Sequence, residues 1–221
     1  MINVTRCRKP ARTIARAPRP SRAFRGTVAL SLALGLAVIP LGADPTHSER
    51  PGAEALTGVA DLNGRPTNPF AKPLPRATVL VFVSTECPIS NRYAPELRRL
   101  QSAFAARGVV FELVYPNADE SATAIREHLK EYQFGLPAVR DARHQLVRLA
   151  KARVTPEAAV FGPAGELLYH GRIDDRYIEL GRERPEASRH DLADTIEAIL
   201  AGKSAPANFQ PAVGCSITEA R

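Results

Sequence analysis

The sequence predicts one α/β domain built on a mixed β-sheet, and three observations lead to this class. An apolar strand pattern at 78–84 is followed by a helical pattern, and a second strand and helix repeat this order. A turn at 162–165 then joins two further strand patterns, and an amphipathic helix follows them. Repeated strand–helix units favour parallel strands joined by right-handed crossovers, and the late hairpin adds antiparallel strands to the sheet.

Each element is expected from its apolar spacing and from the residues that bound it. The run Thr78-Val-Leu-Val-Phe-Val-Ser84 is rich in β-branched and aromatic residues and is too short for a typical helix. In the helix that follows, up to about Arg107, apolar residues share one face, and Gly108 ends it. The other expected elements are a hairpin at 58–65 turning at Asn63-Gly64, a strand at 109–115, a helix at 121–134, a strand at 138–140, a helix at 144–152, strands at 158–161 and 166–171, and a helix at 188–201 with Ser188 as its N-cap.

The first 43 residues have the pattern of an export signal. They contain eight basic and no acidic residues, and an apolar run from Val28 to Leu41 ends at Gly42-Ala43. The run is short for a membrane-spanning helix, which needs about 20 residues. We therefore expect an exported protein of the periplasm or cell envelope. The expected parts are a signal peptide or uncleaved N-terminal anchor at 1–43, a linker at 44–57, a folded domain at 58–202 and a tail at 203–221.

The net charge of +7 belongs to this leader. The rest of the chain holds 22 of the 30 Lys and Arg residues against all 23 Asp and Glu residues. A folded domain without a basic excess is not expected to bind nucleic acid. The sequence also has no glycine-rich phosphate loop, no Ser-His-Asp spacing and no metal-binding cysteine cluster. We expect a monomer with no cofactor and no resident metal, which contacts a membrane only through an uncleaved leader.

Cys87 is the candidate nucleophile. It lies between an apolar strand and a helix, where unpaired backbone N–H groups and the positive end of the helix dipole favour thiolate over thiol. If the leader with Cys7 is removed, only Cys87 and Cys215 remain, and in an oxidising compartment two cysteines can pair. The position of Cys87 therefore indicates redox chemistry.

Four short motifs are informative in combination. They are Val81-Phe-Val-Ser-Thr-Glu-Cys-Pro-Ile-Ser-Asn91, Val154-Thr-Pro-Glu157, Tyr169-His-Gly-Arg-Ile-Asp-Asp175 and Gly214-Cys-Ser216. In this order they resemble exported bacterial redoxins of the thioredoxin/peroxiredoxin (AhpC/TSA-like) superfamily, over roughly residues 56–217. The resemblance implies a thioredoxin fold, with a central mixed sheet flanked by helices, a late β-hairpin and, in this chain, a C-terminal extension.

The resemblance also implies a geometry around Cys87. In that family, the proline that matches Pro156 is cis and packs beside the redox sulfur. A proline has no N–H, so the edge groups of Thr155 are free to pair with the backbone of a substrate polypeptide. Arg172 is a further candidate, because its hairpin directly follows the Pro156 loop. For the charged residues at 174–177, a solvated turn is favoured over a place at the rim of the site.

The chain departs from both family patterns. Ser90 replaces the second cysteine of a Cys-x-x-Cys pair, and its hydroxyl either donates to the Cys87 thiolate or caps the helix. Glu86 opposes thiolate formation at its neighbour. The peroxiredoxin pattern has its Ser/Thr at Ser84, but its proline position is a leucine, and Arg153 is only the nearest match to the catalytic arginine. Disulfide exchange is therefore favoured over peroxide reduction.

Cys215 is the candidate partner of Cys87. About a dozen residues of tail precede it, long enough at ~3.3 Å per residue to span a small domain, and Gly214 permits close approach. A bond between the two cysteines is either a catalytic pair or a structural staple, and the catalytic reading is favoured because a tail cysteine suits a resolving role.

The sequence thus predicts a thiol–disulfide oxidoreductase that acts on a protein thiol or disulfide. Its site residues are Cys87, Cys215, Ser90, Thr155, Pro156 and Arg172. One alternative is a thiol peroxidase in which peroxide oxidises Cys87 to sulfenic acid. Another is a non-catalytic module that docks an envelope partner, or binds copper through Cys87, His170 and His190. His128 is expected on the surface.

Overall fold

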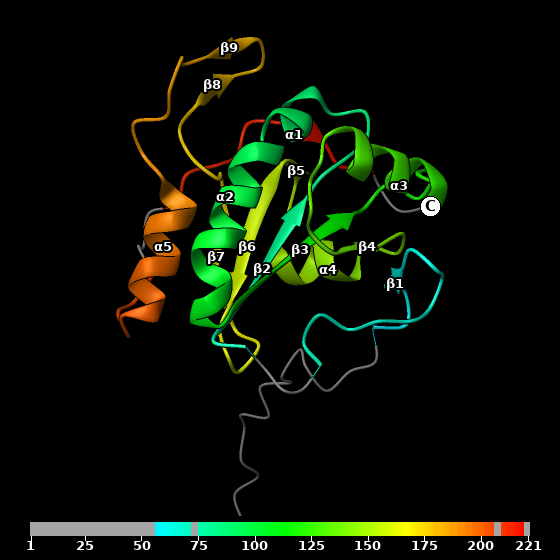
Figure 1. Cartoon of the computed structure of the whole chain (residues 1–221), viewed down its shortest axis with the longest axis horizontal. Coiled ribbons are helices and arrows are strands. Elements are labelled where there is room, and N and C mark those ends of the chain that lie inside the picture. Colours follow the sequence, from blue (N-terminus) through cyan, green and yellow to red (C-terminus); the bar gives the residue numbers. More distant parts are fainter. Residues whose placement is uncertain (1–55, 72–74, 206–208, 219–221) are drawn as a thin grey trace, which may run out of the picture. The chain divides into compact units, whose positions relative to one another are not determined.

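A six-stranded mixed sheet forms the centre of the computed structural model (Figure 1), in the order β1-β4-β3-β2-β6-β7. Strands β2, β3 and β4 are parallel to one another, and β1, β6 and β7 are antiparallel to their neighbours. This is the thioredoxin fold that the sequence predicts. The strands of the sheet are β1 (Ala60–Asp61), β2 (Ala77–Phe82), β3 (Val109–Tyr115), β4 (Ala138–Arg140), β6 (Glu157–Phe161) and β7 (Leu167–Gly171).

The structure describes residues 56–71, 75–205 and 209–218. The expected leader at 1–43, and the expected linker up to residue 55, lie outside these residues. Among the helices that the structure describes, none combines the length and apolar character needed to cross a membrane.

Strand β2 is buried on both faces, and its side chains alternate between two apolar clusters. Val79 and Val81 point into a cluster that holds residues of α2 (Ala94–Phe104), α3 (Ala122–Glu131) and α5 (Asp191–Leu200). Leu80 and Phe82 point into the second cluster, which holds residues of α4 (Gln145–Ala150). Side chains alternate along a strand, so a continuous apolar run reports burial on both sides. The central place of β2 fixes where the chain leaves the sheet at Cys87.

The helix expected from the end of β2 to Arg107 is divided, which corrects the prediction of one element. A short α1 (Pro88–Arg92) ends before α2, and a 3-10 turn, η1 (Ala105–Arg107), follows α2. Pro95 lies in the first turn of α2, and a proline has no N–H for the carbonyl four residues earlier. The hydroxyl of Tyr93, at the junction, donates to Asp174 Oδ1 at 2.5 Å. Cys87 is therefore the N-cap residue of a helix of only five residues.

The charged loop at 174–187 is more ordered than the solvated turn that we expected. It forms an antiparallel ribbon of β8 (Tyr177–Glu179) and β9 (Arg182–Glu183), which lies at the same end of the sheet as α1 in Figure 1. Asp174 and Asp175 are buried. Asp175 accepts hydrogen bonds from the backbone N–H and the hydroxyl of Ser188, at 2.7 and 2.6 Å. Ser188 is therefore not the N-cap of the last helix, which begins at Asp191.

The remaining expected elements have counterparts within a few residues. The turn at Asn63-Gly64 is present, with Gly64 at φ 78°, and β1 before it pairs with β4. The turn at 162–165 joins β6 to β7 as an antiparallel hairpin. Ser121 caps α3 by accepting a hydrogen bond from the Ala124 N–H at 3.1 Å. The tail contains a short strand, β10 (Cys215–Ser216).

Candidate functional site

The two candidate cysteines meet at the end of β2. The Cys87 side chain is buried, with 1% of its surface exposed, and Cys215 is half-buried. Both are free thiols, and the Cys215 thiol donates to the Cys87 sulfur with 2.9 Å between the two Sγ atoms. The Cys87 Sγ also lies 2.9 Å from the Thr155 carbonyl oxygen. A modest movement brings the sulfurs to the S–S bond length of about 2.05 Å, and closing that bond transfers two electrons to an oxidant such as a partner disulfide.

The tail reaches Cys87 by pairing with the segment that precedes Pro156. The Thr155–Pro156 peptide bond is cis, as the resemblance implied. Strand β5 (Val154–Thr155) pairs with β10 in antiparallel register, with Cys215 opposite Thr155. The pairing continues through the Ile217 N–H, which donates to the Arg153 carbonyl at 3.0 Å. The edge groups of Thr155, which were expected to be free for a substrate polypeptide, are thus occupied by the chain's own tail.

The surroundings of the two thiols separate their pKa values. Burial raises the pKa of Cys87, but the hydrogen bond from the Cys215 thiol and the nearby N–H and hydroxyl dipoles of Ser90 lower it by more, so that the pKa lies below the ordinary thiol value. Burial, the hydrogen bond to Cys87 and the negative charge of the Cys87 thiolate together raise the pKa of Cys215 to about 11. Cys87 is therefore the thiol that ionises first, and thiolate is the nucleophilic form.

Ser90 lies in the first turn of α1, at the position where a Cys-x-x-Cys pair has its second cysteine. Its side chain is fully buried, and among the described residues its hydroxyl has no hydrogen-bond partner at ordinary distance. The Ser90 backbone and side chain both lower the pKa of Cys87. Helix capping is not its function, because Cys87 is the N-cap residue of α1.

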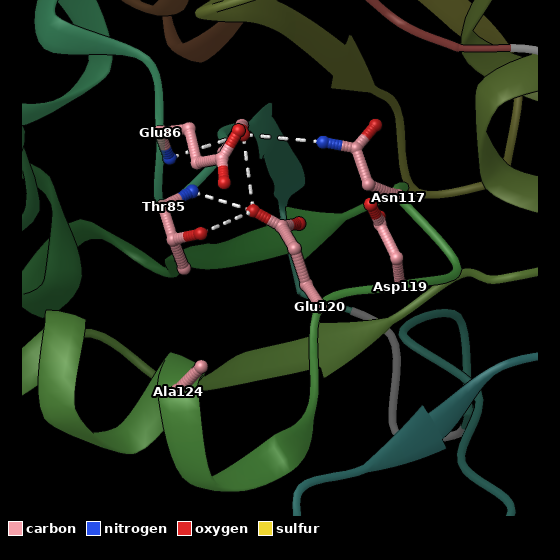
Figure 2. A pocket seen from close by; sticks show the side chains of 7 residues that line it. Thr85, Glu86, Asn117, Asp119, Glu120 and Ala124 are labelled. Atoms are coloured by element: carbon pink, nitrogen blue, oxygen red, sulfur yellow. Dashed lines mark hydrogen bonds between the residues drawn. The ribbon is translucent and has the colours of Figure 1, made fainter.

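A buried carboxylate that sequence reasoning missed holds the loop before Cys87. Glu120 Oε1 accepts hydrogen bonds from the Thr85 N–H at 2.6 Å, the Thr85 hydroxyl at 2.8 Å and the Ser84 hydroxyl at 3.0 Å (Figure 2). The Asn117 amide donates to the Ser84 oxygen at 3.1 Å. Burial raises the pKa of Glu120 despite these bonds.

The signal for Glu120 was its position soon after the second parallel strand. The carboxyl ends of parallel strands meet at one edge of a sheet, so the loop after β3 had to lie beside the loop that carries Cys87. The two loops line a polar cavity of about 150 Å³, with Glu86 and Asp119 at its wall. Glu120 Oε2 is buried there and has no hydrogen-bond partner among the described residues.

Arg172 is not in contact with the thiols. Its guanidinium pairs with Asp191 at the start of α5, with Nε 2.8 Å from Oδ2, and its backbone N–H donates to the Gln210 carbonyl at 3.2 Å. In the described part of the chain, no arginine makes a hydrogen bond to the Cys87 sulfur. Arg172 therefore holds α5 and the tail in place rather than the reacting sulfur.

The histidines do not assemble the copper site considered above. His170 pairs with Glu157, with Nδ1 3.4 Å from Oε1. His190 lies with Glu96 and Asp174 in a group whose ligand atoms are within 4.8 Å of one another, and no second cluster of this kind occurs among residues 56–71, 75–205 and 209–218. Arg99 already donates to both oxygens of Glu96.

His128 is buried rather than on the surface, which corrects that prediction. Its Nδ1 lies 2.8 Å from the Tyr115 hydroxyl oxygen, and its Nε2 lies 2.7 Å from Asn91 Oδ1 on α1. Burial lowers the pKa of His128. The neutral ring thus links α3 to β3 and to the helix that begins at Cys87.

Comparison with known proteins supports the fold. Residues 75–167 match the model of a family described as thioredoxin-like. A hypothetical protein of Sinorhizobium meliloti is similar at 23% identity and a TM-score of 0.63, over 73% of this chain and 89% of that one. An uncharacterized conserved protein of Geobacillus kaustophilus is similar at 23% identity and a TM-score of 0.60, over 73% of this chain and 87% of that one. No curated protein matches the sequence.

Proposed function

We propose that the chain is a thiol–disulfide oxidoreductase in which Cys87 is the nucleophile and Cys215 the resolving thiol, a proposal supported by the match of residues 75–167 to the model of a thioredoxin-like family. The observation that carries the proposal is the 2.9 Å approach of the two free thiols beside the cis Thr155–Pro156 bond. A thiolate beside a protonated thiol is the reduced form, from which reduction of a partner disulfide begins, and the reverse direction begins from the Cys87–Cys215 disulfide.

The reaction begins at Cys87. Its thiolate attacks one sulfur of a partner disulfide, an S–S bond forms to Cys87, and the other partner sulfur leaves as a thiolate. Cys215 then loses its proton and attacks the Cys87 sulfur, and the second partner sulfur leaves as a thiolate. The partner disulfide is reduced by two electrons, and the Cys87–Cys215 disulfide is the oxidised product. The same steps in reverse oxidise a partner dithiol.

The separated pKa values support this order of attack. The Cys87 thiolate contributes to the raised pKa of Cys215 through its charge and its hydrogen bond. Once Cys87 is part of a mixed disulfide, it no longer carries that charge, and the pKa of Cys215 falls. The resolving thiol thus becomes easier to ionise only after the first step has occurred.

The basic, apolar leader at 1–43 supports export as a second part of the proposal. An oxidising compartment lets two cysteines exchange between thiol and disulfide forms. Fractionation of the expressing cells, with mass spectrometry of the N-terminus, tests export: the expected chain starts near residue 44 and lies in the envelope or periplasmic fraction. An intact leader in the cytoplasmic fraction would contradict it.

Trapping tests the mechanism. Cys215→Ser is expected to accumulate mixed disulfides at Cys87, because the resolving thiol is gone, and Cys87→Ser is the control in which none form. Non-reducing mass spectrometry reads the products. A wild-type Cys87–Cys215 bond that never exchanges with thiols would leave only a structural role, and rapid consumption of hydrogen peroxide by Cys87 would favour a thiol peroxidase instead.

A further inference from the structure

The tail occupies the edge of the site as a bound polypeptide would. Among the described residues, β5 is the only strand that pairs with β10, and β5 pairs with no strand of the central sheet. The Thr155 hydroxyl also lies 3.4 Å from the Cys215 carbonyl oxygen. A strand added to a free edge is a general mode of peptide recognition, in which backbone hydrogen bonds supply the affinity.

The register of this pairing decides which side chain reacts. Cys215 lies opposite Thr155, and this position brings its sulfur to 2.9 Å from the Cys87 sulfur. A cysteine one residue earlier or later along the strand would point to the opposite side. A polypeptide that pairs with Val154 and Thr155 in the same register therefore presents its own cysteine to Cys87.

The residue before the cysteine meets the backbone of the site. A Cβ atom on Gly214 would lie 2.1 Å from the Thr155 carbonyl oxygen and 2.6 Å from the Thr155 carbonyl carbon. Contacts under 3.0 Å require a shift, and here the neighbour is backbone beside Pro156 rather than the end of a flexible side chain. Only glycine fits this place without displacing the strand.

We propose that the tail is an internal substrate analogue, and that the partners of this site are extended polypeptide segments with a Gly-Cys pair. This inference rests on the proposed function. Such a segment first replaces β10 as the antiparallel partner of β5, with glycine at the place of Gly214 and its cysteine at the place of Cys215. After the mixed disulfide has formed, β10 returns to β5 and brings Cys215 back to the Cys87 sulfur. Beyond this pairing, Val213 and Ile217 pack against the two apolar clusters of the core. The Phe209 ring, itself 40% exposed, packs on Tyr169 with 5.4 Å between centroids, and Gln210 accepts one backbone hydrogen bond.

Peptide disulfides test the glycine requirement on the full chain carrying Cys215→Ser. The probes are symmetric disulfides of two synthetic peptides, one with the sequence of residues 212–218 and one with alanine in place of Gly214. The Cys87 thiolate attacks each disulfide, one peptide is bound to Cys87, and the other leaves as a thiolate. The glycine peptide is expected to react about tenfold faster, the order of effect of forcing an extra carbon into packed backbone.

Hydroxyethyl disulfide separates this inference from the proposed function. Its rate reports the reactivity of Cys87 without any peptide pairing. If hydroxyethyl disulfide and both peptide disulfides fail to react with Cys87, the proposed function is wrong. If hydroxyethyl disulfide reacts and the two peptides react at equal rates, the function stands and the Gly-Cys preference is overturned.

A substitution in the tail tests the internal analogue. In the otherwise unchanged chain, Gly214→Ala is expected to slow formation of the Cys87–Cys215 disulfide about tenfold, because the added Cβ moves β10 off β5. Ser216→Ala is the matched control, since that side chain is exposed. Circular dichroism confirms that both variants are folded, and a Gly214→Ala chain that closes its disulfide at the wild-type rate would overturn the proposal.

Discussion

The sulfur atoms of Cys87 and Cys215 lie 2.9 Å apart, although 128 residues separate the two cysteines in the chain. One thiol is placed by the end of the central strand β2, and the other by the pairing of the tail with β5. A Cys-x-x-Cys pair holds both thiols on one helix. This pair depends instead on a docked tail, so changes in the tail are expected to alter the chemistry of Cys87 directly.

Replacing Cys215 by Ala is expected to raise the pKa of Cys87. The Cys215 thiol donates a hydrogen bond to the Cys87 sulfur, and a donor to the sulfur favours the thiolate. The alkylation rate depends on the thiolate, which is lost as the pH falls through the pKa, so the rate profile should move to higher pH. Iodoacetamide rates across the pH range measure the shift, with Ser216→Ala as control. A profile that stays in place would contradict the assigned hydrogen bond.

Replacing Ser90 by Ala is expected to raise the pKa of Cys87 and to stabilise the fold. The buried hydroxyl has no hydrogen-bond partner among the described residues, so its removal should increase the free energy of unfolding by about 1 kcal/mol. Its loss also removes a group that favours the thiolate. Urea unfolding and the alkylation profile measure the two effects. A fall in stability would show that the hydroxyl has a partner after all.

Replacing Glu120 by Ala is expected to loosen the loop before Cys87. Three donors on Ser84 and Thr85 lose their acceptor, and the free energy of unfolding should fall by about 2 kcal/mol. Glu120→Gln is the matched control, because its amide oxygen can accept the same bonds. Urea unfolding and hydrogen exchange of the Thr85 amide measure the effect. Equal losses in the two variants would mean that charge, rather than acceptor geometry, holds the loop.

Glu112 should make the stability of the protein depend on pH. Burial on β3 raises the pKa of Glu112 to about 7, above its unfolded value near 4.5. A carboxyl group with a raised pKa stabilises the fold while it is protonated, so this contribution is lost as the pH rises from about 4.5 through 7. Glu112→Gln should unfold like the wild type at pH 4 and be about 2 kcal/mol more stable at pH 8. Equal stability of both proteins at pH 8 would contradict the raised pKa.

Replacing Arg172 by Met is expected to lower stability without changing the thiols. The substitution leaves the half-buried Asp191 carboxylate with only Arg189, 3.5 Å away, as a partner, at a cost of about 1 kcal/mol. Because the guanidinium contacts Asp191 rather than Cys87, the alkylation profile of Cys87 should not move. Urea unfolding measures the free energy of unfolding, and alkylation rates across the pH range measure the profile of Cys87. A shifted profile would restore Arg172 as a residue of the reactive site.

Much of the fold follows from local patterns in the chain. The apolar run at 78–84 reports burial on both faces, and it became the central strand. The turn at 162–165 joined its two strands as predicted. The division of the long helix was also readable, because Pro95 has no N–H to continue it. Such features were predictable because each depends on residues close together in the sequence.

Burial of individual polar groups was harder to predict. His128, Asp174 and Asp175 were expected at the surface, yet all three are buried with hydrogen-bond partners. Their partners lie on other elements, so nothing within the local sequence reports them. Glu120 escaped notice for the same reason, although the order of the parallel strands placed its loop beside Cys87.

The sequence alone identified the strand–helix junction, Cys87 as the candidate nucleophile, the Thr155-Pro156 loop and a second cysteine in the tail. Only the folded chain decided that the tail pairs with β5, that Cys215 lies opposite Thr155, and that Arg172 faces Asp191 instead of the thiols. The physical reason is the range of the interactions. Periodicity and turns act over a few residues, whereas strand register and the pairing of buried charges depend on segments that meet only when the chain has folded.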